Sequence, residues 1–211
     1  MTPSEVLDRI AERRLVMVVR AASAADALRA VAAAKLGGIR VVEITFTVPD
    51  AQRVIRELAR DTELIVGAGT VRTTAHVVEA IEAGAMFLVS PGLDEAALAE
   101  AGRRGVLMVP GILTPSEAMR AADLGAEAIK LFPASTVGPD YLRALLAPLP
   151  ELRVIPSGGI SAGNAGEWLA AGAIAVGMAG QLSPRGAVGA EAESAITQEA
   201  QRSVTAVSRS R

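Results

Sequence analysis

The chain has 211 residues, enough for one domain with a large core, and 51% of them are hydrophobic while only 2% are aromatic. The 23 acidic residues nearly cancel the 21 basic ones, and this balance, together with the few aromatic rings, argues against a nucleic-acid partner. The absence of cysteine excludes disulfides, thiolate metal ligands and cysteine nucleophiles, and the single histidine, His76, excludes a multi-histidine metal site.

The sequence contains no run of the roughly 20 apolar residues that a membrane span requires. Its first segment, MTPSEVLDRIAERR, is charged and lacks the apolar core of a signal peptide. We therefore expect a soluble, cytoplasmic protein with no membrane association.

Short β-rich runs alternate with alanine-rich helical patterns along the whole chain, after a first helix predicted at Ser4–Arg14. The predicted strands are Leu15–Val19, Arg40–Ile44, Leu64–Gly67, Met86–Val89, Val106–Val109, Ala128–Leu131, Arg153–Ile155 and Ala173–Gly177. The helices predicted to follow them are Ala24–Lys35, Ala51–Arg60, Thr74–Ala83, Glu95–Arg103, Pro115–Leu124, Pro139–Leu146, Ala162–Ala171 and Ala190–Val207.

Glycine and capping residues mark the ends of these helices. The predicted C-terminal caps are Gly37-Gly38, Gly84, Gly125 and Gly172, and the predicted N-caps are Asp50, Asp94, Thr114 and Ser161. Because no linker or change in composition divides the chain, we predict a single domain over residues 1–211. Units of such even length favour closure into a (β/α)8 TIM barrel over an open doubly wound sheet.

Lys130 is the most distinctive residue at the C-terminal ends of the predicted strands, where such barrels form their active sites. It interrupts an apolar run, and it is one of only two lysines in a chain that otherwise uses arginine. Burial disfavours the charged form of lysine, and a neutral amine can attack a carbonyl to form an iminium that permits cleavage of a C–C bond. A lysine paired with a buried carboxylate, or reaching the rim, would need no catalytic role.

Glu43 also stands within an apolar run. Fully buried glutamate is rare unless it is paired, so Glu43 is either an inert salt-bridge partner of Lys130 or a proton carrier. On one barrel, the two residues indicate a Schiff-base lysine with its proton shuttle. The other lysine, Lys35, ends a helix, where a surface role is expected.

Glycine-rich segments follow the last two predicted strands. Ser157-Gly158-Gly159 and Ala179-Gly180 offer backbone N–H groups without side-chain obstruction. Barrel enzymes often bind phosphate with the loops after these strands. The pair of loops therefore indicates an anion site beside the lysine.

The rim motifs resemble those of the KDPG/KHG aldolases, in order and over roughly residues 10 to 185. The motifs are Glu43–Asp50, Gly67–Val71, Ser90-Pro91-Gly92, Pro110-Gly111, Lys130–Pro133 and Ser157-Gly158-Gly159. The resemblance implies a class I aldolase that reversibly cleaves 2-keto-3-deoxy-6-phosphogluconate to pyruvate and glyceraldehyde 3-phosphate. It further implies a homotrimer that uses neither a metal nor a cofactor.

The resemblance also assigns roles to individual residues. Lys130 would form the Schiff base and Glu43 would shuttle protons through water. The residues expected to contact substrate are Arg20, Thr70, Pro91, Phe132, Ser157, Gly158, Gly159, Ala179 and Gly180. Two positions depart from the family pattern: Thr47 replaces a common arginine, whose electrostatic role Arg20 would take over, and Gly180 replaces a common serine.

Other functions remain open at the level of sequence. Within the family, the substrate could be the epimer 2-keto-3-deoxy-6-phosphogalactonate or the unphosphorylated 4-hydroxy-2-oxoglutarate. Outside it, the chain could be a phosphate-sugar isomerase or epimerase with Glu43 as base, or a barrel that binds a metabolite without catalysis. The last two alternatives leave the coincidence of the rim motifs unexplained.

Overall fold

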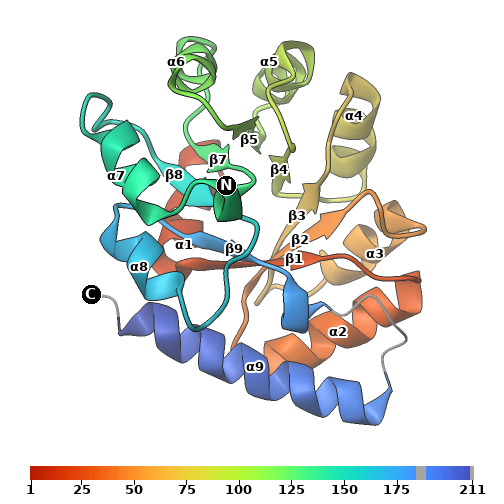
Figure 1. The fold of residues 1–211 in the computed structure, drawn as a ribbon. Coiled ribbons are helices and arrows are strands. Elements are labelled where there is room, and N and C mark those ends of the chain that lie inside the picture. The colour runs from red at the N-terminus through yellow and green to blue at the C-terminus, as the bar shows by residue number, and fades with distance from the viewer. Residues whose placement is uncertain (184–188, 210–211) are drawn as a thin grey trace.

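The computed structural model describes residues 1–183 and 189–209, which form an α/β fold with helices around a curled parallel sheet (Figure 1). The strands are β1 (Leu15–Val19), β2 (Val41–Thr45), β3 (Ile65–Gly69), β4 (Phe87–Val89), β5 (Leu107–Val109), β6 (Gly111–Ile112), β7 (Ile129–Leu131), β8 (Val154–Pro156) and β9 (Val176–Met178). The α-helices are α1 (Pro3–Arg13), α2 (Ala24–Leu36), α3 (Ala51–Leu58), α4 (Thr74–Glu82), α5 (Glu95–Arg103), α6 (Pro115–Asp123), α7 (Pro139–Leu146), α8 (Ala165–Ala170) and α9 (Ala190–Ser208). Two 3-10 turns, η1 (Ala134–Thr136) and η2 (Gly180–Leu182), follow β7 and β9. The alternation of strands and helices predicted from the sequence is confirmed.

All strand pairs are parallel, and they form two sheets. One sheet has the order β5-β4-β3-β2-β1-β9 and the other β6-β7-β8. The fifth predicted strand, Val106–Val109, is observed as β5, and β6, which was not predicted, follows it after Pro110. Pro110 has no N–H to donate to a ladder, although its carbonyl still accepts from the Lys130 N–H at 2.8 Å. At the other edge, a parallel bridge joins Ser157 to Gly177, and the Ile174 N–H donates to the Val154 carbonyl at 3.0 Å.

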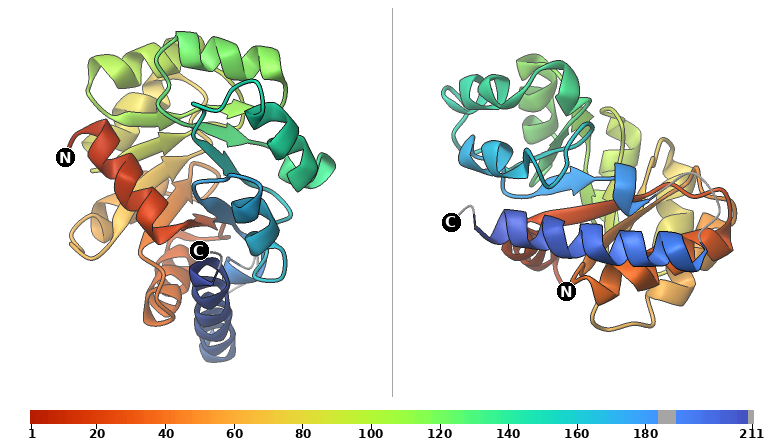
Figure 2. Two further views of the ribbon diagram at one scale, coloured as in Figure 1. Left: turned by 90° about the vertical axis from the view of Figure 1, so that its left-hand side faces the viewer. Right: turned by 60° about the horizontal axis from the view of Figure 1, so that its bottom comes forward.

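Two apolar cores lie on opposite faces of the strands, because successive side chains of a strand point to opposite sides. The larger core lies between the strands and the outer helices. The smaller one fills the inside of the curl with side chains such as Val41, Phe87 and Val109, and α1 packs Leu7 and Ile10 into it. Helix α1 therefore covers one end of the strands (Figure 2).

The helix ends confirm most of the predicted caps. Gly38, Gly84, Gly125 and Gly172 all have positive φ, between 87° and 106°, as a C-terminal glycine cap requires. The prediction for Asp50 is confirmed in position only, and that for Ser161 is wrong. Asp50 has a φ of 55° and its side chain caps nothing, while α8 begins only at Ala165, after Asn164, so that Ser161 lies in the preceding loop. None of the helices in the described ranges is both long and apolar enough to cross a bilayer.

The C-terminal helix α9 lies alongside α2 (Figure 2). The Thr197 hydroxyl donates to the Ala33 carbonyl at 2.9 Å. Gly37, which follows α2, allows this close approach, because a Cβ added there would lie 2.4 Å from the Ala200 Cβ and 2.5 Å from the Thr197 carbonyl oxygen. The long last helix is thus fixed to the body of the fold by a contact that only glycine permits.

We expect Gly37→Ala to lower the free energy of unfolding by about 1–3 kcal/mol, because the methyl group overpacks the α2–α9 contact. Gly102→Ala is the matched control: this residue lies in α5, and an added Cβ meets nothing within 4 Å. The control should be stabilised by about 0.5–1 kcal/mol through its helix propensity. Thermal or urea unfolding measures both, and equal effects of the two substitutions would contradict the assigned contact.

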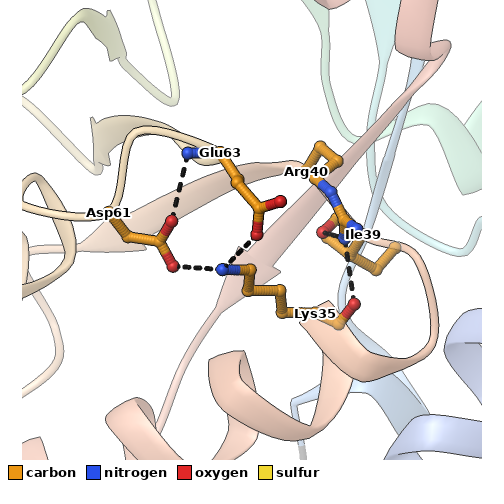
Figure 3. Close-up of polar contacts among 5 residues, drawn as sticks. All are labelled: Lys35, Ile39, Arg40, Asp61 and Glu63. Carbon is orange, nitrogen blue, oxygen red and sulfur yellow. Dashed lines mark hydrogen bonds and ion pairs between the residues drawn. The ribbon is translucent and has the colours of Figure 1, made fainter.

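Lys35, at the end of α2, lies in an ion-pair cluster with the loop before β3 (Figure 3). Its Nζ is 2.5 Å from both Asp61 Oδ2 and Glu63 Oε2. Arg40 donates to the carbonyl oxygens of Lys35 and Ile39 at 2.9 and 2.8 Å. The hydrogen bond that Lys35 donates to Asp61, and next the one that it donates to Glu63, raises the pKa of Lys35, and the lysine lowers the pKa of both carboxyl groups. The role of Lys35 is therefore structural: its ion pairs join the end of α2 to the loop before β3.

Lys35→Met should lower stability near neutral pH, and the difference from the wild type should depend on pH. The lowered carboxyl pKa values stabilise the fold above their ordinary values of 3.8 and 4.5, and this contribution is lost as the pH falls through the folded-state values. The raised pKa of Lys35 contributes below its ordinary value of 10.5, and this part is lost as the pH rises through the folded-state value. Urea midpoints measured across pH, and at high salt where the pairs are screened, test this. The exposed Arg60 is the control, since Arg60→Met should give no such profile; a difference for Lys35→Met that is constant with pH would contradict the assignment.

Candidate active site

Lys130 and Glu43 face each other inside the curl of the sheet. Lys130 lies in the middle of β7 and Glu43 in the middle of β2, and their residues are 6% and 3% exposed. The Lys130 Nζ is 3.7 Å from Glu43 Oε1, and that oxygen is buried without a hydrogen-bond partner among the described residues. A tight charge-assisted hydrogen bond would be about 2.7–2.9 Å long. The amine and the carboxylate are thus close to each other without forming a short hydrogen bond. An inert salt bridge would be expected to close this gap.

Gly69 makes room for the Glu43 carboxylate. It ends β3, the strand next to β2, where it pairs with Thr45. A Cβ at this position would lie 2.0 Å from Glu43 Oε1 and 2.6 Å from its Cδ. The glycine in this motif therefore allows close packing against a buried carboxylate, a role that its place in the sequence did not reveal.

A small cavity lies beside the pair, and its other walls are mainly apolar. Glu43, Lys130 and Ser157 are its polar residues, and Ile10 of α1 closes it from below. It offers about 20 Å³ to the centres of water molecules, enough for about one water. The site can accordingly hold a water between a carboxylate and an amine while excluding bulk solvent.

A larger cavity opens above the pair and is shared by most of the predicted substrate contacts. It offers about 340 Å³ by the same measure. The predicted residues that line it are Arg20, Phe132, Ser157, Gly158, Gly159, Ala179 and Gly180. Phe132 also borders the amine, with its ring centroid 5.3 Å from the Lys130 Nζ. Since Ser157 lines both cavities, the mouth and the buried pair lie next to each other.

Arg20 is the cation of this mouth. Its Nε is buried and has no hydrogen-bond partner among the described residues. Thr47 shares a neighbouring hollow with it. The Thr47 hydroxyl lies 2.7 Å from the Thr45 hydroxyl, which donates to the Val19 carbonyl at 2.8 Å. A group able to bind an anion therefore stands on the end of β1, and a hydroxyl stands where an arginine is common in the resembling family.

Thr70 and Pro91 lie at the same end of the strands, but neither lines the two cavities formed by the described residues. Thr70 directly follows β3 and has a φ of 58°, which is unusual for a β-branched residue and typical of functional sites. The backbone of Pro91 packs so closely on Gly111 that a Cβ on this glycine would be 2.4 Å from it. Gly111 in turn pairs with Lys130. The structure thus places both residues next to the site rather than in its walls.

The two lysines have different surroundings. Lys35 is held by two carboxylates at 2.5 Å, whereas Lys130 has one carboxylate at 3.7 Å and lies against a cavity. Within residues 1–183 and 189–209, no three His, Asp or Glu side chains are grouped to hold a metal ion. Sequence reasoning missed Ser183, a buried serine beside Arg20, because no pattern links residues so far apart in the chain.

Comparison with known proteins agrees with this geometry. A family model described as KDPG and KHG aldolase matches residues 6–199. The chain is 34% identical over 174 residues to the probable 2-dehydro-3-deoxy-6-phosphogalactonate aldolase of Rhizobium meliloti, an alignment that covers 81% of this chain and 82% of that protein. It is 36% identical over 170 residues to the 2-dehydro-3-deoxy-phosphogluconate aldolase of Pseudoalteromonas atlantica, with 80% and 79% covered.

A solved structure extends the likeness to the fold. It is the KDPG aldolase from Legionella pneumophila, with pyruvate captured at low pH as a covalent carbinolamine intermediate. The TM-score is 0.84 at 29% sequence identity, and the alignment covers 95% of this chain and 97% of that one. The family model spans most of the chain, including every residue of the candidate site. The chain therefore belongs to the KDPG and KHG aldolase family, whose members are lyases.

Proposed function

We propose that the protein cleaves 2-keto-3-deoxy-6-phosphogluconate reversibly to pyruvate and glyceraldehyde 3-phosphate, through a Schiff base on Lys130. The observation that carries the proposal is the buried pair of an amine and an unpartnered carboxylate oxygen 3.7 Å apart, beneath an open mouth. The carbinolamine in the Legionella pneumophila relative supports a covalent amine mechanism. If Lys130 were only a structural cation, neither the 3.7 Å separation from Glu43 nor the cavity beside the pair would be explained.

In the first stage, the Lys130 Nζ attacks the C2 carbonyl of the keto acid to give a carbinolamine. Loss of the C2 hydroxyl as water then forms the iminium, and this step needs a proton donor. Glu43, whose Oε1 is 3.7 Å from the Lys130 Nζ, would supply this proton through a water. The small cavity beside the pair suits such a water.

In the second stage, the bond between C3 and C4 breaks, and its electron pair enters the iminium to form an enamine. The C4 hydroxyl loses its proton to Glu43 and becomes the aldehyde carbonyl. Protonation of the enamine at C3 gives the pyruvyl iminium, and water releases pyruvate from Lys130. One carboxyl group, acting alternately as base and acid, serves each proton transfer.

The mouth would hold the two anionic ends of the substrate. The Gly158-Gly159 and Ala179-Gly180 loops offer backbone N–H groups for the phosphate, and Arg20 adds a positive charge at the same cavity. Phe132 borders the amine, and by family resemblance Thr70 and Pro91, next to the site, would contact the pyruvyl carboxylate. The absence of a hydroxyl at Gly180 leaves this cradle to backbone groups and to Arg20.

The proposal includes a closed (β/α)8 barrel made by residues 1–211 as a single domain. Closure is supported by the bridge between Ser157 and Gly177, and by the hydrogen bond from Lys130 to the Pro110 carbonyl, which continues the ladder past the proline. It is also supported by a common inner core to which strands of both sheets contribute. By family resemblance, the protein would act in the cytoplasm as a homotrimer, which sedimentation or light scattering can measure.

The second candidate substrate is the epimer 2-keto-3-deoxy-6-phosphogalactonate. It is favoured by the name of the Rhizobium meliloti relative, while the Pseudoalteromonas atlantica relative is named for the gluconate-derived acid. The family description also includes KHG, the unphosphorylated 4-hydroxy-2-oxoglutarate. The kcat/KM values of the three compounds, measured side by side, decide among them.

Borohydride added with pyruvate should leave a stable pyruvyl adduct on Lys130, because reduction traps the iminium. Lys130→Ala should carry no adduct and should show no aldol cleavage. Since the chain has only two lysines, peptide mapping by mass spectrometry identifies the site directly. Lys35→Arg is the control and should label like the wild type; an adduct on Lys35, or none, would overturn the mechanism, and turnover without trapping would indicate an isomerase or epimerase.

Glu43→Gln should slow the exchange of pyruvate methyl protons with solvent by about 10²–10⁴-fold, because an amide cannot relay the proton. Glu199→Gln is the matched control, since Glu199 is also buried but pairs with Arg202 on α9. NMR in deuterated water measures the exchange. Wild-type exchange in Glu43→Gln would remove Glu43 from the mechanism.

A further inference from the structure

We infer that Ser183 is a positioning residue that holds Arg20 against the turn after β9, and so sets the geometry of the anion-binding end of the mouth. Ser183 directly follows η2 and is 5% exposed. Its hydroxyl accepts from the Arg20 N–H at 2.8 Å and donates to the Arg20 carbonyl at 3.1 Å. The inference rests on the proposed function, because it takes the ligand of this mouth to be a phosphorylated keto acid.

The Ser183 hydroxyl provides hydrogen bonds to the Arg20 backbone where strand pairing has already ended. Strands β1 and β9 pair from Leu15↔Val176 to Met17↔Met178, so Arg20 lies past the end of that ladder. Both its N–H and its carbonyl nevertheless have partners on this side, because a serine hydroxyl can donate and accept at one atom. One side chain thereby does the work of a further pair of ladder hydrogen bonds.

The same residue also belongs to the turn that carries the backbone amides. The Ser183 N–H donates to the Gly180 carbonyl at 3.2 Å, and Gly180 has a φ of 48° that suits glycine. Arg20, Gly180 and Ser183 all line the mouth cavity. The two hydrogen bonds between the Ser183 hydroxyl and the Arg20 backbone therefore fix the backbone of Arg20 relative to the turn. The arginine side chain and the amides of the turn are the groups that would bind one anion together.

Because the Arg20 Nε has no hydrogen-bond partner among the described residues, the contact of the Arg20 backbone with Ser183 affects anion binding. Because no described residue accepts from that buried N–H, no ion pair there orients the guanidinium before the ligand arrives. Its orientation then depends on the backbone that carries it. Without the Ser183 hydroxyl, the end of β1 could shift away from the turn. The guanidinium group would then be in the orientation that binds phosphate for a smaller fraction of the time.

Ser183→Ala should raise KM for the phosphorylated keto acid about tenfold, the effect of one or two lost hydrogen bonds, and should leave kcat within about twofold. The inhibition constant of inorganic phosphate, used as a competitive probe, should rise by a similar factor. Pyruvate proton exchange should be unchanged, because it needs only Lys130 and Glu43. Ser203→Ala is the matched control: Ser203 is buried nearby on α9, and its hydroxyl has no hydrogen-bond partner among the described residues.

A double-mutant cycle with Arg20→Ala separates positioning from a general structural effect. If Ser183 acts through Arg20, Ser183→Ala should add no further loss of phosphate affinity in the Arg20→Ala background. Ser183→Thr and Ser183→Val, which differ only in the hydroxyl, keep the test valid if the alanine variant does not fold; the threonine variant should retain the tighter KM.

Unchanged KM in Ser183→Ala, equal losses in cleavage and pyruvate exchange, or full additivity with Arg20→Ala would each overturn the inference. These outcomes are distinct from failure of the proposed function. That failure would appear in the wild type, as an absence of aldol cleavage and of the borohydride adduct.

Discussion

The proposed chemistry depends on a lysine and a glutamate that are buried together in an otherwise apolar interior. Removing two charges from water costs several kcal/mol for each ion, and attraction within the pair offsets this only if the geometry is good. Here the amine and the carboxylate are 3.7 Å apart, and one carboxylate oxygen has no hydrogen-bond partner among the described residues. Because the amine and the carboxylate are farther apart than in a short hydrogen bond, the surrounding strands and side chains must fix their positions.

The scaffold achieves this positioning through strand register and close packing. Glu43 and Lys130 lie mid-strand, where the ladders β2·β3 and β7·β8 fix their backbones. Gly69 leaves space for the carboxylate, and α1 closes the interior below with Ile10. Because parallel strands gather their C-terminal ends at one edge, the loops proposed to bind the rest of the substrate lie at the same end of the fold as the mouth. In the proposed mechanism the reactive groups therefore come from rigid strands and the substrate contacts from the loops, a division that lets one chemistry serve variable substrates.

The sequence predicted what depends on local pattern. Strand β1 was predicted to the residue, as were α5 and α7, and the glycine caps followed from the left-handed conformation that helix ends require. Lys130 and Glu43 could be found because a charged residue in an apolar strand is conspicuous. What failed depended on context: a capping side chain does not cap if its backbone, like that of Asp50, turns left-handed. The space left by Gly69 and the bond from Ser183 to Arg20 join segments distant in sequence, and no local pattern encodes them.

The departure at Thr47 has a physical consequence that its hydrogen bonds make specific. The Thr45 hydroxyl spends its only proton on the Val19 carbonyl, so the short contact between the two threonines requires Thr47 to be the donor. With its proton given to the Thr45 hydroxyl, Thr47 has only lone pairs left for the neighbouring hollow that it shares with Arg20, and lone pairs repel a carboxylate or a phosphate. It therefore cannot replace an arginine in binding an anion, although it can accept from a sugar hydroxyl. The positive charge stands instead beyond the neighbouring strand end, at Arg20, so in the proposed function the binding of the anionic ends depends on how Arg20 is held.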